Sequence, residues 1–460
     1  MKHQSEPDQI PSMLLKISAP AIAKPVTTLI NESLATGYIP KLWKTARVVP
    51  IHKSGDNTLV SNYRPISLLP VMSKILEKFV YTQLRDYYQY WNYLTPDQSG
   101  FRPNHSTTTA LSKVCNDIQA GMAQGNLTGA VFFDFAKAFD TVDHGILLQK
   151  FKNSSIGDRT LTWFQSYVSD RSQYVSISDS TSLPLPVTCG VPQGSILGPL
   201  LFTIFINDLP NVCKASTVHM YADDTVIYTS KPDLPQLEAV LQEQFTEVEK
   251  WIKHNKLFLN TDKTVTMLFG TAPKLHKLQT PHLCVGTRSN GTLTTVTSLK
   301  YLGMWLDPNL CFGPHIEKLS SKFYPKLGAL YRNKSCLSPA VRKQIVQQML
   351  MQAIEYGDVV MWLPRKHTSR NLLHCITHSA TLCYNFPQQF PRPITSDPGP
   401  APYLQYHNTK KKVARSSFSY RAPQLWNNLP DAIKSSPCLK SLKSSLLTYL
   451  NTECTCKHVT

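Results

Sequence analysis

Two adjacent carboxylates at the bend between two apolar segments constrain this chain more than any other feature of its sequence. Residues 217–229 are predicted to form two strands, and Asp223-Asp224 lies at the tight turn between them. Like charges this close raise each other's pKa and destabilise a fold unless a cation lies between them. Oxygen-rich sites of this kind suit Mg²⁺, which binds a few carboxylates together with substrate phosphates. The alternative is a solvated turn, where Asp-Asp pairs are common.

A third carboxylate lies inside a predicted buried strand. In Val131-Phe-Phe-Asp-Phe135, the side chain of Asp134 is surrounded in sequence by apolar and aromatic residues. An isolated ionised carboxylate in such a strand is costly unless it is paired or bound to metal. With the pair at the turn, Asp134 would complete a cluster for two metal ions ~3.5–4 Å apart. The alternative is a strand-end aspartate that caps the next helix, and Asp140 and Asp143 further along fit helix-start or solvent roles.

Length and charge narrow the class of protein. The chain has 460 residues, more than one hydrophobic core usually serves, so roughly two or three lobes are expected. Its 48 Lys and Arg against 30 Asp and Glu give a net charge of +18, which favours nucleic acid or an anionic membrane surface as partner. We find no signal-peptide pattern and no apolar run of the ~18–20 residues that a membrane helix needs. The 11 scattered cysteines fit a reducing interior, so a cytoplasmic or nuclear protein outside the membrane is expected.

Hydrophobic periodicity predicts mixed helices and strands. Apolar residues recur at helical spacing in several segments, and short apolar runs between turn signals indicate strands. The proline-rich residues 385–402 argue against a helix and indicate a linker or a wrapped loop. Helices are predicted at 20–34, after Ile66 through about 88, and at 196–205, 237–252, 318–332, 339–354 and 439–450, with strands at 46–51, 131–135 and on both sides of the turn in 217–229.

Seven strings of residues occur in order along the chain. They are Asn62-Tyr-Arg-Pro-Ile-Ser-Leu68, Gln98-Ser-Gly-Phe-Arg102, Phe133-Asp-Phe-Ala-Lys-Ala-Phe-Asp140, Gly190-Val-Pro-Gln-Gly-Ser-Ile-Leu-Gly-Pro199, Tyr221-Ala-Asp-Asp224, Leu259-Asn-Thr-Asp-Lys-Thr264 and Lys300-Tyr-Leu-Gly303. Together, over roughly residues 35–310, they resemble the reverse transcriptase of non-LTR retrotransposons of the LINE type, in particular the jockey-like ones.

The resemblance implies an α+β fold shaped like a right hand. Fingers would come from about 35–120, a palm with an antiparallel sheet from about 121–310 and a helical thumb from 311–390. An N-terminal segment, 1–34, would precede them, and a Pro-rich linker with a basic, helical tail, 391–460, would follow. The implied reaction is RNA-directed DNA synthesis with two Mg²⁺ ions, or Mn²⁺ in their place. The implied partners are an RNA template, a DNA primer and dNTPs, while the oligomeric state stays open.

Catalytic roles carry over to the acidic residues and to one lysine. Asp134, Asp223 and Asp224 would be the metal ligands. Lys263 matches the late palm lysine that is proposed to protonate the leaving pyrophosphate. Lys300-Tyr-Leu-Gly303 resembles a hairpin that supports the primer end.

Substrate-binding roles carry over to the fingers and to the loop Pro192-Gln-Gly194. Lys53 and Arg64 would hold the triphosphate, Arg through bidentate contacts and Lys as a point charge, although a solvated surface position is the alternative for Lys53. Gln193 would hydrogen-bond the substrate, and Gly194 would allow close backbone approach. Phe139 would exclude a ribose 2′-hydroxyl by steric clash, with an ordinary core position as its alternative. Substrate contacts are also predicted for Phe135 and Tyr221.

Two other readings remain open. One is a catalytically silent, retrotransposon-derived protein that keeps the fold and binds nucleic acid. The other is a related right-hand enzyme, an RNA-dependent RNA polymerase or a group II intron maturase, against which Phe139 and the string Asn62–Leu68 argue. Because the polymerase strings begin so near residue 1, we expect an N-terminally truncated copy, a fragmentary gene model or the C-terminal part of a longer polyprotein.

Overall fold

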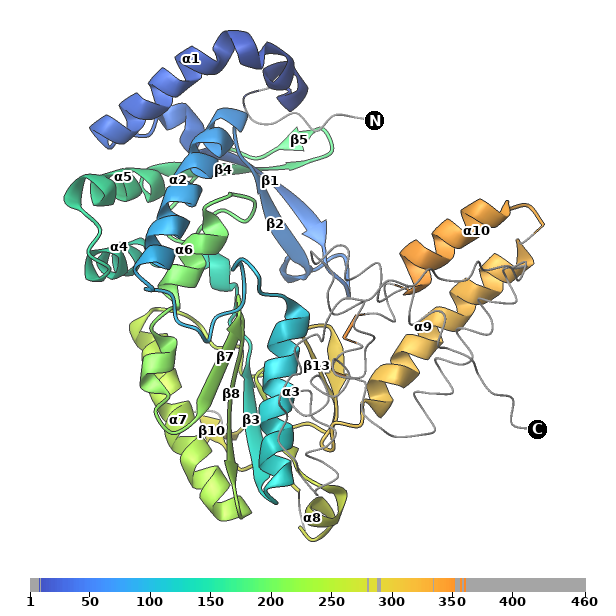
Figure 1. Ribbon diagram of the computed structural model, residues 1–460. Coiled ribbons are helices and arrows are strands. Elements are labelled where there is room, and N and C mark those ends of the chain that lie inside the picture. Colours follow the sequence, from blue (N-terminus) through green and yellow to red (C-terminus); the bar gives the residue numbers. More distant parts are fainter. Residues whose placement is uncertain are drawn as a thin grey trace, which may run out of the picture.

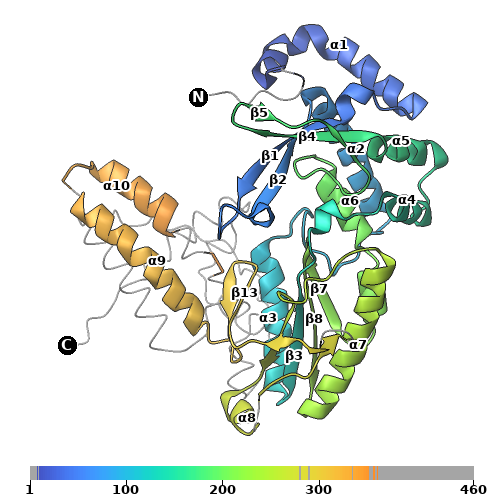
Figure 2. The ribbon, with the colours of Figure 1, turned by 180° about the vertical axis from the view of Figure 1, so that it is seen from behind.

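The structure is a computed structural model that describes residues 8, 10–278, 281–287, 291–333, 335–351, 356, 357 and 360 (Figures 1 and 2). The predicted linker at 385–402, the helix at 439–450 and the tail 391–460 lie outside the described residues. Helices and two larger sheets make an α+β fold, as the sequence predicts.

The central sheet carries the predicted acidic residues. Its five strands lie in the order β12-β9-β3-β8-β7. Neighbouring strands are antiparallel except β12 and β9, which are parallel, so the predicted antiparallel sheet is found with one exception. The strands are β3 (Leu127–Phe133), β7 (Thr217–Tyr221), β8 (Asp224–Lys231), β9 (Val265–Phe269) and β12 (Thr294–Thr295).

Helices cover both faces of this sheet, and β3 is therefore buried along its whole length. Its side chains alternate between two cores, as the two-residue period of a strand requires. Val131 and Phe133 belong to the core that includes residues of α7 (Leu234–His254), whereas Ala130 and Phe132 belong to the core that includes residues of α3 (Thr107–Ala123). Figures 1 and 2 show α7 and α3 on opposite sides of β3 and β8.

The second sheet joins segments that are distant in sequence. In it, β1 pairs antiparallel with β2 and parallel with β4, and β4 also pairs with β5 and β6. Residues 171–187, which the sequence division placed in the palm, thus pair with strands from the segment predicted as fingers. Conversely, α3, predicted in the fingers, packs on the palm sheet. The strands are β1 (Thr45–His52), β2 (Tyr63–Leu68), β4 (Arg171–Ile177), β5 (Ser180–Thr181) and β6 (Leu185–Val187).

Most predicted helices are found, with shifted ends. The helix predicted at 196–205 begins at Gly198, because the preceding residues form a turn in which Ser195 Oγ accepts a hydrogen bond from the Gly198 N–H at 2.7 Å. The remaining helices up to residue 280 are α1 (Ser12–Thr36), α2 (Val71–Tyr90), α4 (His144–Asn153), α5 (Asp158–Val168), α6 (Gly198–Phe205) and α8 (Ala272–His276), with 3-10 turns η1 (Lys41–Lys44), η2 (Val60–Asn62), η3 (Ala138–Asp140) and η4 (Leu209–Val212).

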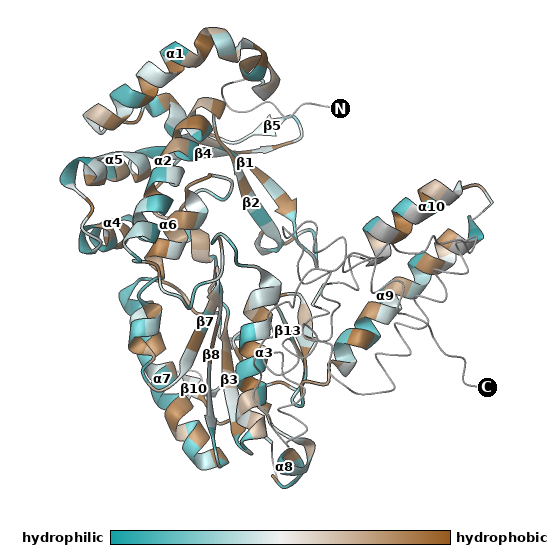
Figure 3. Cartoon of the chain, viewed as in Figure 1, coloured by the Kyte–Doolittle hydropathy of each residue, from teal (hydrophilic) through white to brown (hydrophobic). Residues whose placement is uncertain are grey.

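Helix α1 is longer than predicted and mostly exposed. It contains Pro20 and Pro25, and hydrophobic residues are spread along it (Figure 3). Within the described part of the chain, Met13–Thr36 is the one helical segment long and apolar enough to cross a membrane by length and composition. The expectation that no apolar stretch has this length is therefore wrong. A single segment of this kind near the N-terminus is weak support for a membrane contact, because signal sequences and core helices pass the same test.

The described C-terminal part is a hairpin followed by helices. The hairpin strands are β13 (Leu299–Tyr301) and β14 (Met304–Leu306), and α9 (Gly313–Arg332) packs against β14. Helices α9 and α10 (Pro339–Ile345) lie side by side and away from the central sheet (Figures 1 and 2). A π-helical turn, η5 (Val346–Met351), follows α10, and the short strands β10 (Gly286–Thr287) and β11 (Gly291–Thr292) pair earlier. The thumb assignment stays a prediction.

Candidate active site

The turn between β7 and β8 presents two carboxylates at the end of the central sheet. Tyr221 pairs with Asp224, so Ala222 and Asp223 form the two-residue turn of the hairpin. Ala222 has φ of 58°, in the left-handed region that tight hairpin turns use. Asp223 and Asp224 are exposed. The predicted hairpin with an acidic bend is therefore confirmed in its structure.

Strand pairing brings Asp134 to the same place. Phe133, the last residue of β3, pairs with Thr225 of β8. Because the strands are antiparallel, Asp134, which follows Phe133, lies opposite Asp224, which precedes Thr225. Paired positions on antiparallel strands are ~4.5–5.5 Å apart at Cα, so the two carboxylates originate from neighbouring points. The β3–β8 register therefore brings the backbones of the three predicted acidic residues to the same end of the central sheet.

The electrostatics of the cluster disfavour three negative charges. Burial of charge, then the charges of Asp223 and Asp134, raise the pKa of Asp224 to about 6. The pKa of Asp223 is also raised, by burial first and then by Asp134, while Arg64 and Lys53 lower it. Both side chains touch solvent, yet enough protein surrounds the carboxyl groups for desolvation to be the largest cause. A bound cation would relieve this repulsion.

The donor set fits a hard divalent cation, although the side chains do not converge on one point. Among the described residues, no three or more His, Cys, Asp or Glu side chains stand close enough together to hold a metal ion. The three aspartates supply only oxygen donors, which suit Mg²⁺ better than softer metals.

The loop that carries Lys263 packs against Asp134. The Asp134 N–H donates to Thr264 Oγ1 at 3.2 Å, and the Asn260 N–H donates to the Asp134 carbonyl at 2.9 Å. Two residues after Asp134, the Ala136 N–H donates to the Phe258 carbonyl at 2.8 Å. Lys263 itself is exposed on this loop. The proton-transfer role of Lys263 stays a prediction.

The basic residues of the second sheet face the same cluster. Lys53 directly follows β1, and Arg64 lies on β2 opposite Ile51. Both side chains are exposed, and the charges of both lower the pKa of Asp223. The structure thus brings the predicted triphosphate-binding residues within electrostatic reach of the acidic turn, although they come from a different sheet.

The loop Pro192-Gln-Gly194 is hydrogen-bonded to β2 on one side and to η3 on the other. The Gln193 carbonyl accepts a hydrogen bond from the Ser67 N–H at 2.7 Å, and Gln193 Nε2 donates to Asp140 Oδ1 at 2.9 Å. Gly194 has φ of 129°, and a Cβ there would lie 2.4 Å from the Ser67 carbonyl oxygen. The glycine is therefore required by the packing of β2, which the substrate-based argument from sequence did not anticipate.

Asp140 is a site residue that the sequence reasoning missed. It was predicted at a helix start or in solvent, but it is half-buried in η3 and bonded to Gln193. Burial raises its pKa, while Gln193, Lys137 and Lys53 lower it. The signal was present, because Asp140 closes the string Phe133–Asp140. Asp143, by contrast, does cap a helix, since its Oδ1 accepts from the Ile146 N–H at 2.9 Å.

The three aromatic residues predicted to contact substrate differ in exposure: Phe139 and Tyr221 are half-buried, and Phe135 is buried. Phe139 is half-buried, stacks on Phe202 at 4.5 Å between ring centroids and meets the edge of Phe101 at 6.3 Å. Part of its ring therefore packs in the core. Its role in excluding a ribose 2′-hydroxyl stays a prediction. Phe135 is 5 % exposed and stacks on Phe133, so the structure does not support a substrate contact for its ring. Tyr221 is half-buried beside the turn.

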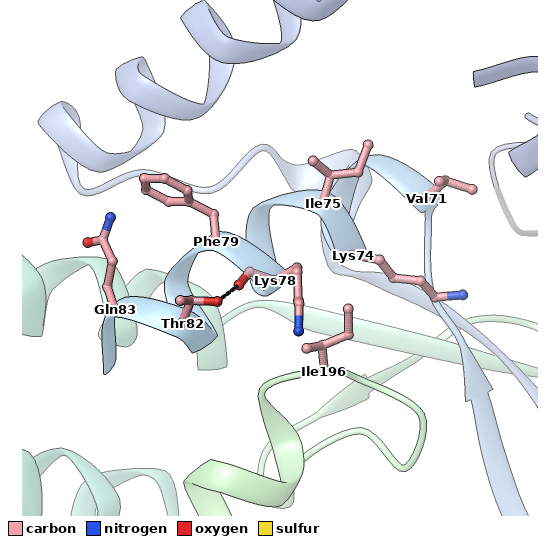
Figure 4. A pocket seen from close by; sticks show the side chains of 8 residues that line it. All are labelled: Val71, Lys74, Ile75, Lys78, Phe79, Thr82, Gln83 and Ile196. Atoms are coloured by element: carbon pink, nitrogen blue, oxygen red, sulfur yellow. Dashed lines mark hydrogen bonds between the residues drawn. The ribbon is translucent and has the colours of Figure 1, made fainter. Parts of the chain in front are cut away.

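A shallow cavity of about 610 Å³ lies on the surface of α2 (Figure 4). Seven of its eight lining residues belong to α2, and the eighth, Ile196, follows the loop of Gln193. None of the three aspartates lines it. The cavity is therefore a hollow beside one helix, distinct from the candidate active site.

Comparisons with known proteins agree with the motif reading. A family model described as "Reverse transcriptase (RNA-dependent DNA polymerase)" matches residues 51–306. The chain is 31 % identical over 352 residues to the RNA-directed DNA polymerase from mobile element jockey of Drosophila melanogaster, covering 74 % of this chain and 37 % of that protein. It is 29 % identical over 406 residues to the probable RNA-directed DNA polymerase from transposon BS of the same species, covering 85 % and 43 %.

The chain thus spans well under half the length of these curated relatives. Among solved structures, apo telomerase from Candida Tropicalis aligns with a TM-score of 0.42 at 10 % identity, covering 95 % of this chain and 72 % of that one. The same telomerase in complex with a fragment of telomeric RNA aligns with a TM-score of 0.41 at 12 % identity, covering 94 % and 68 %. Likeness at this level assigns no function.

Proposed function

The chain belongs to the reverse transcriptase (RNA-dependent DNA polymerase) family, and we propose that it extends a DNA primer with dNTPs on an RNA template by two-metal nucleotidyl transfer, as part of LINE-type retrotransposition. The observation that most supports this reaction is the β3–β8 register. It places Asp134 beside Asp223 and Asp224, with cationic residues of a second sheet in electrostatic range.

Asp134, Asp223 and Asp224 would hold the metal. Two Mg²⁺ ions bound there, or Mn²⁺ in their place, would supply the charge that activates the primer 3′-hydroxyl and stabilises the leaving pyrophosphate. The aspartates must be ionised to bind these ions, so the raised pKa of Asp224 means that below about pH 6 a cation would have to displace its proton.

Positive charge and shape would position the nucleotide. Arg64 and Lys53 would bind the triphosphate, and Lys263 Nζ would give a proton to the departing pyrophosphate oxygen. Gln193, held by Asp140, would contact the incoming nucleotide, and the edge of Phe139 would exclude a 2′-hydroxyl. The surplus of positive charge would attract template and primer backbones.

The proposed reaction also suggests which part of the chain forms each lobe and where in the cell the protein acts. We assign the sheet of β1, β2 and β4 to the fingers, the central sheet to the palm and α9 with α10 to the start of a thumb. A cytoplasmic or nuclear location suits these substrates. Any further activity of a longer protein, such as cleavage of a DNA target, would be a separate proposal, and the residues described here do not support one.

Primer extension tests the proposal directly. Purified chain, poly(rA)/oligo(dT), dTTP and Mg²⁺ should give extended products with the wild type and none with Asp223→Asn. Asp179→Asn, an exposed aspartate between β4 and β5, is the matched control and should retain activity. A folded wild type that binds the primer–template but never extends it would favour the catalytically silent derivative instead.

A further inference from the structure

Gln98 is a fully buried side chain to which the proposed reaction gives no role. It opens the string Gln98–Arg102, and its exposure is 0 %. Its Oε1 accepts hydrogen bonds from the Ala222 N–H at 3.0 Å and the Gly100 N–H at 2.6 Å. Its Nε2 donates to the Ala222 carbonyl at 3.4 Å. One carboxamide therefore holds both polar groups of the residue that precedes Asp223.

The backbone around Gln98 joins the outer edge of the central sheet. The Met220 N–H donates to the Asp97 carbonyl, and the Ser99 N–H donates to the Met220 carbonyl, both at 2.8 Å. Gln98 and Met220 form an isolated parallel bridge. Because β7 is the last strand in the order of that sheet, this segment pairs with the edge that would otherwise be open. The contact is therefore continuous from β7 into the acidic turn.

Gly100 allows this close approach. A Cβ at Gly100 would lie 2.2 Å from the Ala222 nitrogen and 2.9 Å from its Cα. The φ of Gly100 is not positive, so the glycine is required by space and not by an unusual backbone conformation. The three residues Gln98-Ser-Gly100 thus form a tight support against the turn.

The turn needs such support for two reasons. Ala222 adopts the left-handed conformation, which is unfavourable for an L-residue without the local hydrogen bonds that Asn or Asp side chains make. Ala222 is also buried, at 7 % exposure, so its N–H and carbonyl need protein partners. Gln98 supplies a partner for each. Without it the turn would relax, and Asp223, the next residue, would move with it.

We propose that Gln98 is a positioning residue that fixes the Ala222–Asp224 turn in the geometry that binds divalent metal. This inference rests on the proposed function, because it assigns Gln98 to the metal site of that reaction. Gln98 contacts neither metal nor substrate and acts through the backbone of Ala222.

The test compares two buried polar side chains of the same segment. Gln98→Met keeps the approximate shape and removes all three hydrogen bonds to the turn and to Gly100. Ser99→Ala removes a different buried contact, that between Ser99 Oγ and His219 Nε2 at 3.2 Å, and leaves the Ala222 contacts in place. Mn²⁺ binding to the full chain without nucleic acid is measured by electron paramagnetic resonance, alongside thermal unfolding without metal.

Gln98→Met should weaken Mn²⁺ binding by about tenfold or more, the usual effect of losing a group that orients metal ligands, whereas Ser99→Ala should bind like the wild type. Equal affinities in Gln98→Met and wild type would overturn the proposal, as would equal losses in both variants. If Gln98→Met does not fold, Gln98→Asn replaces it. That variant stays neutral but is one methylene shorter, so its amide is withdrawn from Ala222 and the same loss of Mn²⁺ affinity relative to Ser99→Ala is expected.

Hydrogen exchange separates this inference from the proposed function. The Ala222 amide should exchange faster in Gln98→Met than in Ser99→Ala, and unchanged exchange would show that Gln98 does not hold the turn. A wild type whose Mn²⁺ binding equals that of Asp223→Asn would refute the proposed metal site itself. Gln98 would then lose its role in metal binding whatever the exchange rates.

Discussion

The carboxylate of Glu77 accepts a hydrogen bond from the backbone N–H of Ile196 at 2.7 Å, which ties α2 to the loop that carries Gln193. Glu77 is 1 % exposed, and its other oxygen accepts from Tyr167 Oη at 3.0 Å and Ser73 Oγ at 3.3 Å. Burial raises its pKa even though the hydrogen bonds from Ile196 and Tyr167 favour the charged form. The loop that carries Gln193 is thus held by a buried acid on a neighbouring helix.

We expect Glu77→Gln to be destabilising although it is nearly isosteric. All partners of Glu77 are donors, so the amide NH₂ of glutamine would face a donor and leave a buried group unpaired. The expected loss is about 2–4 kcal/mol in the free energy of unfolding, measured by urea denaturation. Glu32→Gln, an exposed change on α1, is the control and should have no effect. An unchanged midpoint for Glu77→Gln would contradict the assigned contacts.

Asp224→Asn should stabilise the metal-free protein while abolishing primer extension. The folded chain holds the pKa of Asp224 at about 6 against an ordinary 3.8, so ionised Asp224 is unfavourable at neutral pH. Removing the charge should add about 1 kcal/mol at pH 8, a small gain because the side chain is exposed and solvent screens it. The gain should vanish near pH 4, where Asp224 is protonated in the fold. Urea denaturation at both pH values checks this, and a destabilised variant at pH 8 would argue against it.

Metal binding should weaken as pH falls through about 6. The folded pKa of Asp224 is raised, so below that value the ligand is protonated and a cation must compete with the proton. Mn²⁺ affinity, measured by electron paramagnetic resonance between pH 5 and 8, should fall with decreasing pH and level off above about pH 7. Affinity that is constant across this range would rule out Asp224 as a ligand.

Phe139→Val should admit ribonucleotides. A smaller side chain would open space beside the sugar, and discrimination by steric clash should drop by roughly 10- to 100-fold in the ratio of kcat/KM for dTTP over UTP. Because Phe139 stacks on Phe202, some loss of stability is also expected. Phe79→Val, at an exposed position on α2, is the control for purification and assay. If the ratio does not change, Phe139 is a packing residue alone.

Gly194→Ala should destabilise the chain, whereas Gly157→Ala should not. The new Cβ at 194 would lie 2.4 Å from the Ser67 carbonyl, and its φ of 129° disfavours any side chain. A loss of about 1–3 kcal/mol is expected from these two effects. At Gly157 no atom lies within 4 Å of an added Cβ and φ is not positive. Thermal unfolding of both variants decides the matter, and equal stability would refute the close contact with β2.

Local patterns in the sequence were sufficient for the secondary structure that carries the acidic residues. Short apolar runs predicted the strands before Asp134 and around Asp223, because alternation and turn residues act over a few positions. The ordered strings predicted the family. The same local signals predict the ends of helices less accurately. Helix α1, for example, begins at Ser12, well before its predicted start at residue 20.

Contacts between distant segments were decided only by the tertiary structure. The parallel pairing of β4 with β1, which moved residues 171–187 into the fingers sheet, has no local signature because any β-strand can pair with another. The burial of Phe135 and the bond between Asp140 and Gln193 likewise depend on what packs nearby. The sequence by itself identified the three carboxylates of the proposed site. The position of the turn depends on Gln98 meeting Ala222 across 124 residues, a contact that hydrogen-bonding geometry in the folded core alone can specify.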